Sequence, residues 1–265
     1  MALGQSFEDT EVAEHYGYRP DYPADLFAKL YELSPQHHHA LDLGCGPGKV
    51  ARQICTVFDS VTAVDASEAM LTIAQNLQSN SEETDRTNIR WVHSPAETAD
   101  FADHNFDLIV AAASIHWMDH TRLFPRLLAH VAGDYVFAVV DGDGAHHPPW
   151  QSEWGDFLGK WIFELTGQTY APDNTDSAFA KKMKRHKDWL RLEGEASFEH
   201  TCTQTIDDFI RCQFSRDTFA PSKLGNRRGE FSEQLRRVVS PHADPMDVLT
   251  YRVLTRVEWG KIRTV

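Results

Sequence analysis

The sequence predicts an α/β fold in which a mostly parallel sheet is covered by helices on both faces. Short apolar runs alternate with longer segments whose apolar residues recur at helical spacing. The first apolar run, ALDL, leads into a loop with glycines at every second position, Gly44, Gly46 and Gly48. Ligands bind beyond the carboxyl ends of the strands in an open parallel sheet, so this loop is the expected binding region.

The first half of the chain supplies the alternating elements. A helical segment occupies the N-terminus, and Ser67 is a suitable N-cap for a helix over residues 67–77. Five strands are expected, over residues 40–43, 61–64, 89–93, 106–111 and 135–140. Further helices are expected over residues 24–31, 49–58 and 122–130. A polar loop is expected over residues 79–87.

The pattern changes after Asp141. An aromatic helix is expected over residues 150–165, and residues 195–205 and 248–259 alternate as two further strands around a helical insertion at 206–240. We therefore expect three parts. They are an N-terminal helical cap (1–35), a ligand-binding core (36–141), and lid helices with the last two strands (142–265).

Composition and charge narrow the range of partners. The 265 residues carry a net charge of −13, which argues against a nucleic-acid backbone as the main partner. No apolar run approaches the roughly 20 residues that span a bilayer, and no secretory leader is visible. The four cysteines lack CxxC spacing and are typical of reduced thiols. We expect a cytoplasmic monomer or homodimer that acts on a small molecule.

A run of three histidines precedes the first strand. Adjacent residues of an extended chain point to opposite sides, so His37, His38 and His39 do not converge as metal ligands would. A polar lead-in to the strand is therefore favoured, and no metal is expected.

The glycine loop differs from two common nucleotide-binding motifs. Lys49 stands where a dinucleotide loop, G-x-G-x-x-G, has its third glycine, and Val50 follows it where a phosphate-binding P-loop needs Ser or Thr. Asp65 ends the second strand, where a carboxylate can accept hydrogen bonds from both hydroxyls of a ribose. The alternative for Asp65 is a helix cap. The pair of signals indicates a ribose-bearing cofactor.

Four segments of the first half form a recognisable set. They are DLGCGPG at 42–48, VDAS at 64–67, SPAE at 94–97 and NFDLIV at 105–110. Together they resemble the motifs of class I S-adenosylmethionine-dependent methyltransferases. SIHWMD at 114–119 and RPDYP at 19–23 are similar to the small-molecule subgroup that includes trans-aconitate methyltransferase and related type 11 methyltransferase-domain proteins. The resemblance covers about residues 7–141. It implies a Rossmann-like, seven-stranded, mostly parallel sheet with a helical lid from C-terminal insertions.

The resemblance also implies the cofactor, S-adenosyl-L-methionine, with S-adenosyl-L-homocysteine as product, and roles for single residues. Gly44 and Gly46 would let the backbone approach the methionine part, and Asp65 would hold the ribose. Arg19 is a candidate for the cofactor carboxylate, which a guanidinium binds bidentately, with a surface ion pair as the alternative. Pro95 replaces an often acidic residue, so the adenine amino group would rely on backbone or on a neighbouring side chain. The cofactor candidates are Tyr16, Arg19, Gly44, Gly46, Asp65, Ala66, Met70, Ala96, Glu97 and Ala112.

His116 is the candidate catalytic residue, because it follows the fourth strand where the transferred methyl should point. A hydroxyl acceptor needs a general base, whereas a carboxylic acid with a pKa near 4 needs none. His116 is therefore either a base or a pocket wall. Trp150, Trp154 and Trp161 fall near one helical face, which suits a substrate roof or core packing equally. The substrate-binding candidates are His116, Trp117, Trp150, Trp154 and Arg211.

These observations favour methyl transfer to a small molecule, in the first place O-methylation of a carboxylate or hydroxyl. Carbon or nitrogen of a natural-product intermediate is the alternative acceptor. Action on nucleic acid or protein is disfavoured, because residues 112–115 read AASI rather than the acidic or Asn-Pro-Pro-aromatic tetrapeptide of base-methylating enzymes. A non-catalytic nucleotide-binding fold is the remaining hypothesis.

Overall fold

The computed structural model describes residues 5–34, 36–79, 88–102, 105–170 and 178–264. The chain forms two compact units, which we describe separately. The sheet unit comprises residues 21–142, 181–198 and 255–265, and the helical unit comprises residues 1–20, 143–180 and 199–254. This division differs from the three parts expected from the sequence, because α2 (Ala24–Leu33) packs in the core of the sheet unit through Leu26, Phe27 and Leu30.

The expected mostly parallel sheet is confirmed. Its parallel strands are β1 (His39–Leu43), β2 (Ser60–Asp65), β3 (Ile89–His93), β4 (Phe106–Ala112) and β5 (Val131–Asp141). Among the described residues the strand order is β3-β2-β1-β4-β5-β8-β6, with β7 (Leu190–Thr205) also paired to β8 (Val248–Ile262). β8 runs antiparallel to β5, and the short β6 (Ala145–His146) pairs with the part of β8 in the helical unit. The carboxyl ends of β1, β2, β4 and β5 therefore meet at one edge.

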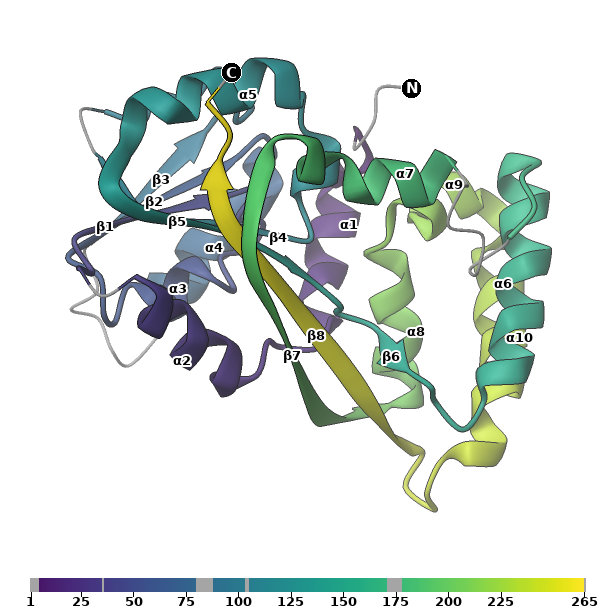
Figure 1. Cartoon of the computed structure of the whole chain (residues 1–265). Coiled ribbons are helices and arrows are strands. Elements are labelled where there is room, and N and C mark those ends of the chain that lie inside the picture. The colour runs from purple at the N-terminus through teal and green to yellow at the C-terminus, as the bar shows by residue number, and fades with distance from the viewer. Residues whose placement is uncertain (1–4, 35, 80–87, 103–104, 171–177, 265) are drawn as a thin grey trace. The chain divides into compact units, whose positions relative to one another are not determined.

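Helices cover both faces of the sheet unit (Figure 1). α2, α3 (Ala51–Ile54) and α4 (Glu68–Ser79) lie on one face, and α5 (His120–Leu127) lies on the other. α3 is shorter than the helix expected over 49–58. It begins only at Ala51, because three glycines with positive φ hold the preceding residues in turns, and residues 55–57 form turns after it. Of the polar loop expected at 79–87, Ser79 ends α4 and the rest lies outside the described residues.

The helical unit is built around aromatic side chains. α1 (Thr10–His15), α6 (Gln151–Thr166), α8 (Ile206–Phe214), α9 (Pro221–Leu224) and α10 (Arg228–Val239) are its helices, and α7 (Ala178–Lys184) leads back to the sheet unit. Trp150 and Trp161 are fully buried here, and the rings of Trp161 and Phe231 are 5.1 Å apart. Within the described residues, no helix has both the length and the apolar character that a membrane crossing requires.

Short 3₁₀ helices complete the chain. They are η1 (Gln5–Glu8), η2 (Tyr16–Tyr18), η3 (Ile115–Trp117), η4 (Leu128–His130), η5 (Arg185–Asp188), η6 (Asp217–Phe219), η7 (Gly225–Arg227) and η8 (Ser240–His242). Of these, η3 directly follows β4, and η5 directly precedes β7.

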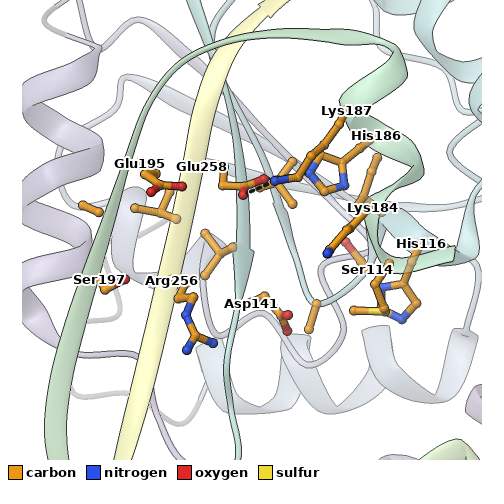
Figure 2. A pocket seen from close by; sticks show the side chains of 17 residues that line it. Ser114, His116, Asp141, Lys184, His186, Lys187, Glu195, Ser197, Arg256 and Glu258 are labelled. Carbon is orange, nitrogen blue, oxygen red and sulfur yellow. Dashed lines mark hydrogen bonds and ion pairs between the residues drawn. The ribbon is translucent and has the colours of Figure 1, made fainter. Parts of the chain in front are cut away.

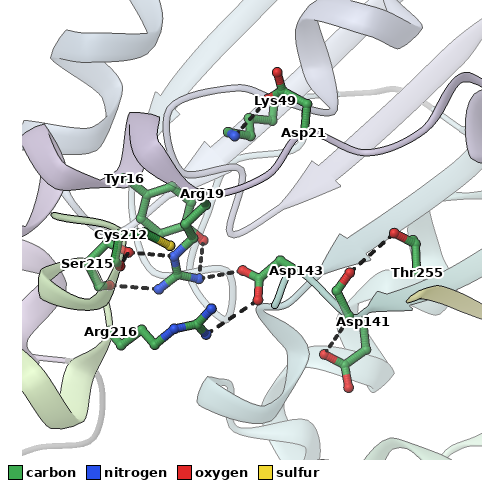
Figure 3. A network of polar contacts seen from close by, with 11 residues as sticks. Tyr16, Arg19, Asp21, Lys49, Asp141, Asp143, Cys212, Ser215, Arg216 and Thr255 are labelled. Carbon is green, nitrogen blue, oxygen red and sulfur yellow. Dashed lines mark hydrogen bonds and ion pairs between the residues drawn. The ribbon is translucent and has the colours of Figure 1, made fainter. Parts of the chain in front are cut away.

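A buried ion-pair network holds the helical unit together (Figure 3). The Nη1 of Arg19 donates to Asp143 Oδ2 at 2.8 Å and to the Tyr16 hydroxyl at 3.2 Å. Its Nε and Nη2 donate to the hydroxyl and the carbonyl of Ser215, both at 2.7 Å. Arg216 pairs with the second oxygen of Asp143 at 3.4 Å. Burial alone would raise the pKa of Asp143, but the two guanidinium groups hold it well below its usual range.

Replacing Asp143 with asparagine should lower the free energy of unfolding by about 3–5 kcal/mol, because Arg19 would lose the counter-charge it needs when buried. Urea unfolding of the full chain at pH 7 measures this loss. Since the folded pKa of Asp143 is depressed, its contribution should be complete above about pH 4 and should disappear as the pH falls further. The control is Asp134→Asn, whose exposed pair with Lys261 should contribute about 1 kcal/mol or less. Equal losses in the two variants would contradict this prediction.

Candidate functional site

Asp65 fixes the glycine loop to the end of β2. Its Oδ2 accepts the backbone N–H of Gly46 at 2.8 Å, and its Oδ1 accepts the N–H of Ser67 at 2.8 Å. The N–H groups of Gly44 and Cys45 both lie within hydrogen-bond distance of the Val64 carbonyl. The loop after β1 is therefore tied to the strand beside it. The cap of α4 is Ser67, as the sequence predicts, since its hydroxyl accepts the N–H of Met70 at 3.2 Å, and Asp65 in turn holds the backbone of Ser67. A carboxylate with about four acceptor positions retains capacity for a ligand.

Gly44 must be glycine because the segment after β4 lies against it. Its φ is +65°, and a Cβ atom there would lie 2.5 Å from the Cβ of Ser114. The Ser114 hydroxyl donates to the Leu43 carbonyl. The glycine loop and the residues that follow β4 thus form one continuous surface at the carboxyl edge of the sheet.

One buried and one half-buried carboxylate, Asp42 and Asp65, make this edge electronegative. Asp42 is 1% exposed, and only its Oδ2 has a partner, the N–H of Ala51 at 3.0 Å. Its Oδ1 is buried without a hydrogen-bond partner. Burial, with added repulsion from Asp65, raises the pKa of Asp42 to about 7. Burial also raises the pKa of Asp65, although the N–H groups of Ser67 and Gly46 oppose the shift. Cations and hydroxyl donors are the ligands that this arrangement favours.

A pocket of about 340 Å³ opens beside the same edge (Figure 2). Ala113 and Ser114 connect it to the glycine loop, and His116 from η3 lies on its wall. Its other walls come from the end of β5, from α7 and η5, and from β7 and β8. The lining side chains with polar or charged groups are Ser114, His116, Asp141, Lys184, His186, Lys187, Glu195, Ser197, Arg256 and Glu258.

The sheet unit holds most of the cofactor candidates. Met70 and Ala96 are buried, Ala112 is partly buried at the end of β4, and Ala66 is exposed after β2. The Glu97 carboxylate accepts the backbone N–H of Asp119, which orients it at the sheet edge. His116 is 8% exposed, and its ring centroid lies 4.8 Å from that of the neighbouring Trp117.

The helical unit holds the remaining candidates, and their partners there differ from those expected. Arg19 directs its guanidinium donors to Asp143, Ser215 and Tyr16, so it does not present a free fork to a carboxylate. Its ion pair is buried rather than on the surface. Tyr16 stacks on Arg19 at 4.0 Å.

The other substrate candidates of the helical unit are an arginine and two tryptophans. Arg211 donates to the Tyr18 hydroxyl at 3.1 Å and pairs with Asp208. Trp150 is fully buried, and Trp154 is partly buried with its ring stacked on Phe157. In the described structure these tryptophans therefore contribute to packing.

The histidine run has separate partners. His37 contacts the Tyr31 carbonyl, His38 pairs with Asp59, and His39 contacts the Ser60 hydroxyl. In the part of the chain that the structure describes, His, Cys, Asp and Glu side chains do not gather in threes as a metal site requires.

Sequence reasoning missed several residues of the site. Asp42 lies within a motif that was recognised for its glycines, and its burial on β1 shows its importance only in the structure. The basic and acidic walls of the pocket come from residues 183–197 and 256–258, which carry no local motif. His186 and Glu258 are far apart in the chain and meet only because η5 and β8 are adjacent, with Nε2 3.0 Å from Oε2.

Comparisons with known proteins give a domain family for part of the chain. Residues 40–133 match the model of the methyltransferase domain family. A Klebsiella pneumoniae protein named trans-aconitate 2-methyltransferase is 35% identical over 128 residues, which are 47% of this chain and 46% of that protein. The Paracidovorax citrulli protein of the same name is 32% identical over 169 residues, or 60% and 58% of the two chains. A Saccharomyces cerevisiae protein named "Probable S-adenosylmethionine-dependent methyltransferase" is 29% identical over 171 residues, which are 60% of this chain and 57% of that protein. The chain thus spans about half the length of these curated relatives.

A solved structure is similar in fold over most of the chain, beyond the residues that the family model matches. The "Putative Type II Methyltransferase" of Anaeromyxobacter dehalogenans matches with a TM-score of 0.65 at 20% identity, over 92% of this chain and 97% of that one. The shared architecture is the mostly parallel sheet with helices on both faces.

The residues of the glycine loop fit the cofactor of this family. S-adenosylmethionine carries cationic ammonium and sulfonium groups together with ribose hydroxyls. Asp42 has a buried carboxylate oxygen without a partner, which a cation would satisfy, and Asp65 retains acceptor capacity for hydroxyls. Residues 40–133 therefore form a methyltransferase domain, and the four sequence motifs and the relatives agree with S-adenosylmethionine as its cofactor.

Proposed function

We propose that this protein transfers a methyl group from S-adenosylmethionine to an oxygen atom of a small molecule, a carboxylate or a hydroxyl. The observation that supports it is the pocket of about 340 Å³ that begins at Ser114, the residue in contact with Gly44 of the glycine loop. Its volume suits a metabolite of modest size. The relatives named trans-aconitate 2-methyltransferase support a small organic acid as one acceptor class.

The cofactor supplies an activated methyl group, so the protein mainly has to position two molecules. Asp65 would accept hydrogen bonds from the ribose, and Asp42 would face the cationic part of the cofactor. The backbone at Gly44 and Gly46 would allow close approach, and Met70, Ala96 and Glu97 would lie near the adenine. Correct alignment of acceptor and methyl group can lower the barrier by about 7–11 kcal/mol. The pocket walls would exclude water from the reacting atoms.

The direct test uses methyl-labelled S-adenosylmethionine and an extract of small metabolites. We expect the label in one or a few products of low molecular mass, identified by mass spectrometry. Calorimetry with the cofactor and with NAD should show binding of S-adenosylmethionine alone. The proposal would be wrong if the folded protein bound the cofactor but labelled only nucleic acid or protein, or if it bound NAD in preference.

Replacing Asp65 with alanine should weaken cofactor binding by about 10-fold to 100-fold, because the ribose loses a charged acceptor whose hydrogen bond is worth about 1.5–3 kcal/mol. Isothermal titration of the two proteins measures the difference. Asp59→Ala is the matched control, since Asp59 lies just before β2 and its carboxylate pairs with the exposed His38. An unchanged affinity in a folded Asp65→Ala protein would refute the ribose assignment.

The affinity for S-adenosylmethionine should fall as the pH drops below about 7. In the free protein Asp42 takes up a proton near that pH, and a cation can bind beside it only after the proton leaves. We expect a decrease approaching tenfold for each pH unit below 7 and a plateau above it. Calorimetry between pH 5.5 and 8.5 measures this, and Asp42→Asn should bind more weakly with a flatter profile. A steep profile in the asparagine variant would show that another group titrates.

His116 should act mainly as a pocket wall. It is buried beside Trp117, and Asn would keep much of its shape. We therefore expect His116→Asn to reduce turnover by about tenfold or less, whereas loss of a general base typically costs 10²–10⁴-fold. Initial rates with the labelled cofactor distinguish the two ranges. A loss above a hundredfold with unchanged cofactor affinity would make His116 the base instead.

A further inference from the structure

His186 is a buried polar residue of the pocket. The contacts of the glycine loop do not explain its role. It lies in η5, is 5% exposed and lines the pocket (Figure 2). Its Nε2 lies 3.0 Å from Glu258 Oε2, but its Nδ1 is buried without a hydrogen-bond partner. Buried side-chain nitrogens are rarely left unpaired in native proteins. Because His186 also lies on the wall of the pocket, its unpaired Nδ1 is a position where a bound molecule can complete the hydrogen bonding.

Glu258 fixes which nitrogen of His186 carries the proton. Burial would raise the pKa of Glu258, but hydrogen bonds from Lys187 and His186 hold it below its usual range. An ionised carboxylate can only accept, so Nε2 donates to it. In the neutral ring Nδ1 then carries a lone pair.

The charges of the pocket are balanced. Lys184, Lys187 and Arg256 contribute positive charge, and Asp141, Glu195 and Glu258 contribute negative charge. Apolar side chains such as Ile115 and Met183 form part of the wall. A site for a polycarboxylate would need a clear excess of cations. This pocket instead suits a molecule of low net charge that presents one hydrogen-bond donor to Nδ1.

We propose that His186, held by Glu258, is the general base of the acceptor pocket, and that the acceptor is a hydroxyl-bearing or amine-bearing molecule rather than a polycarboxylate. This inference rests on the methyl transfer to a small molecule that the proposed function states; it removes polycarboxylates from the acceptors and adds amines to the hydroxyl compounds. As the acceptor is methylated, its O–H or N–H bond breaks and the proton moves to Nδ1. The electron pair of that bond stays on the oxygen or nitrogen, which bonds to the methyl carbon, and the pair of the broken carbon–sulfur bond stays on sulfur. The imidazolium faces the Glu258 carboxylate and returns its proton to water.

The first experiment observes the ring without any turnover. Full-length protein labelled with ¹⁵N-histidine is studied by NMR at pH 7.5, and the His186 signals are identified by their loss in His186→Gln. We expect a neutral ring with the proton on Nε2 and a lone pair on Nδ1. Glu258→Gln should shift the tautomer balance toward Nδ1–H. A doubly protonated ring in the wild-type protein, or a proton on Nδ1 alone, would overturn the proposal.

The second experiment measures methyl transfer from labelled S-adenosylmethionine into the metabolite extract. His186→Gln should reduce transfer by about 10²–10⁴-fold with cofactor affinity unchanged by calorimetry. Glu258→Gln, which preserves shape, should reduce it less and provides the test if His186→Gln does not fold. His200→Gln is the matched control, because its Nδ1 is also buried and unpaired but lies outside the pocket, and it should leave transfer unchanged.

The products distinguish a failure of this proposal from a failure of the proposed function. Methyl ethers or methylated amines support the proposal, whereas methyl esters of polycarboxylates as the main products would overturn it and leave the proposed function intact. Transfer within tenfold of wild type in a folded His186→Gln protein would also overturn it. Absence of cofactor binding, or of any labelled small molecule from the wild-type protein, would instead be a failure of the proposed function.

Discussion

The hydrogen bond from the Gly46 N–H to the Asp65 carboxylate is the constraint on which the rest of the site depends. Three glycines with positive φ give the loop after β1 many accessible conformations, and ordering it is entropically costly. β1 and β2 are adjacent and parallel, so the carboxyl end of β2 lies beside this loop and Asp65 can hold it. Once the loop is fixed, Asp42 is buried beneath it and Ser114 packs against Gly44. The cofactor region and the entrance of the pocket are thus set by one carboxylate.

Much of this arrangement could be predicted from the sequence, for identifiable reasons. β1, β2, β4 and β5 are buried on both faces and appear as continuous apolar runs, so their place in a parallel sheet and the edge where they end could be inferred. Asp65 is recognisable because it comes directly after such a run. The network of Arg19 could not be inferred, since Asp143 and Ser215 are distant in the chain. The same holds for the contact between His186 and Glu258, which depends on how η5 lies against β8.

The aromatic helix α6 shows a different limit of sequence reasoning. A tryptophan on one face of a helix indicates that the face is covered, but periodicity does not say whether protein or ligand covers it. Trp161 is covered by Phe231 and by the guanidinium of Arg227, which lies 4.4 Å from its ring. Trp150 packs edge-on to Phe209 and Tyr251. These partners come from α8, η7, α10 and β8, and their identity depends on the tertiary fold alone.

The position of β8 in the sheet has a consequence for folding. β8 pairs with β5, yet the whole helical insertion separates the two strands in the chain. Contacts between such distant segments require closure of a long loop and form slowly. Until β8 docks, residues 136–140 of β5, which are all apolar, form an unprotected edge strand. Such an edge can pair with another chain, so aggregation competes with folding at this step and gains as protein concentration rises.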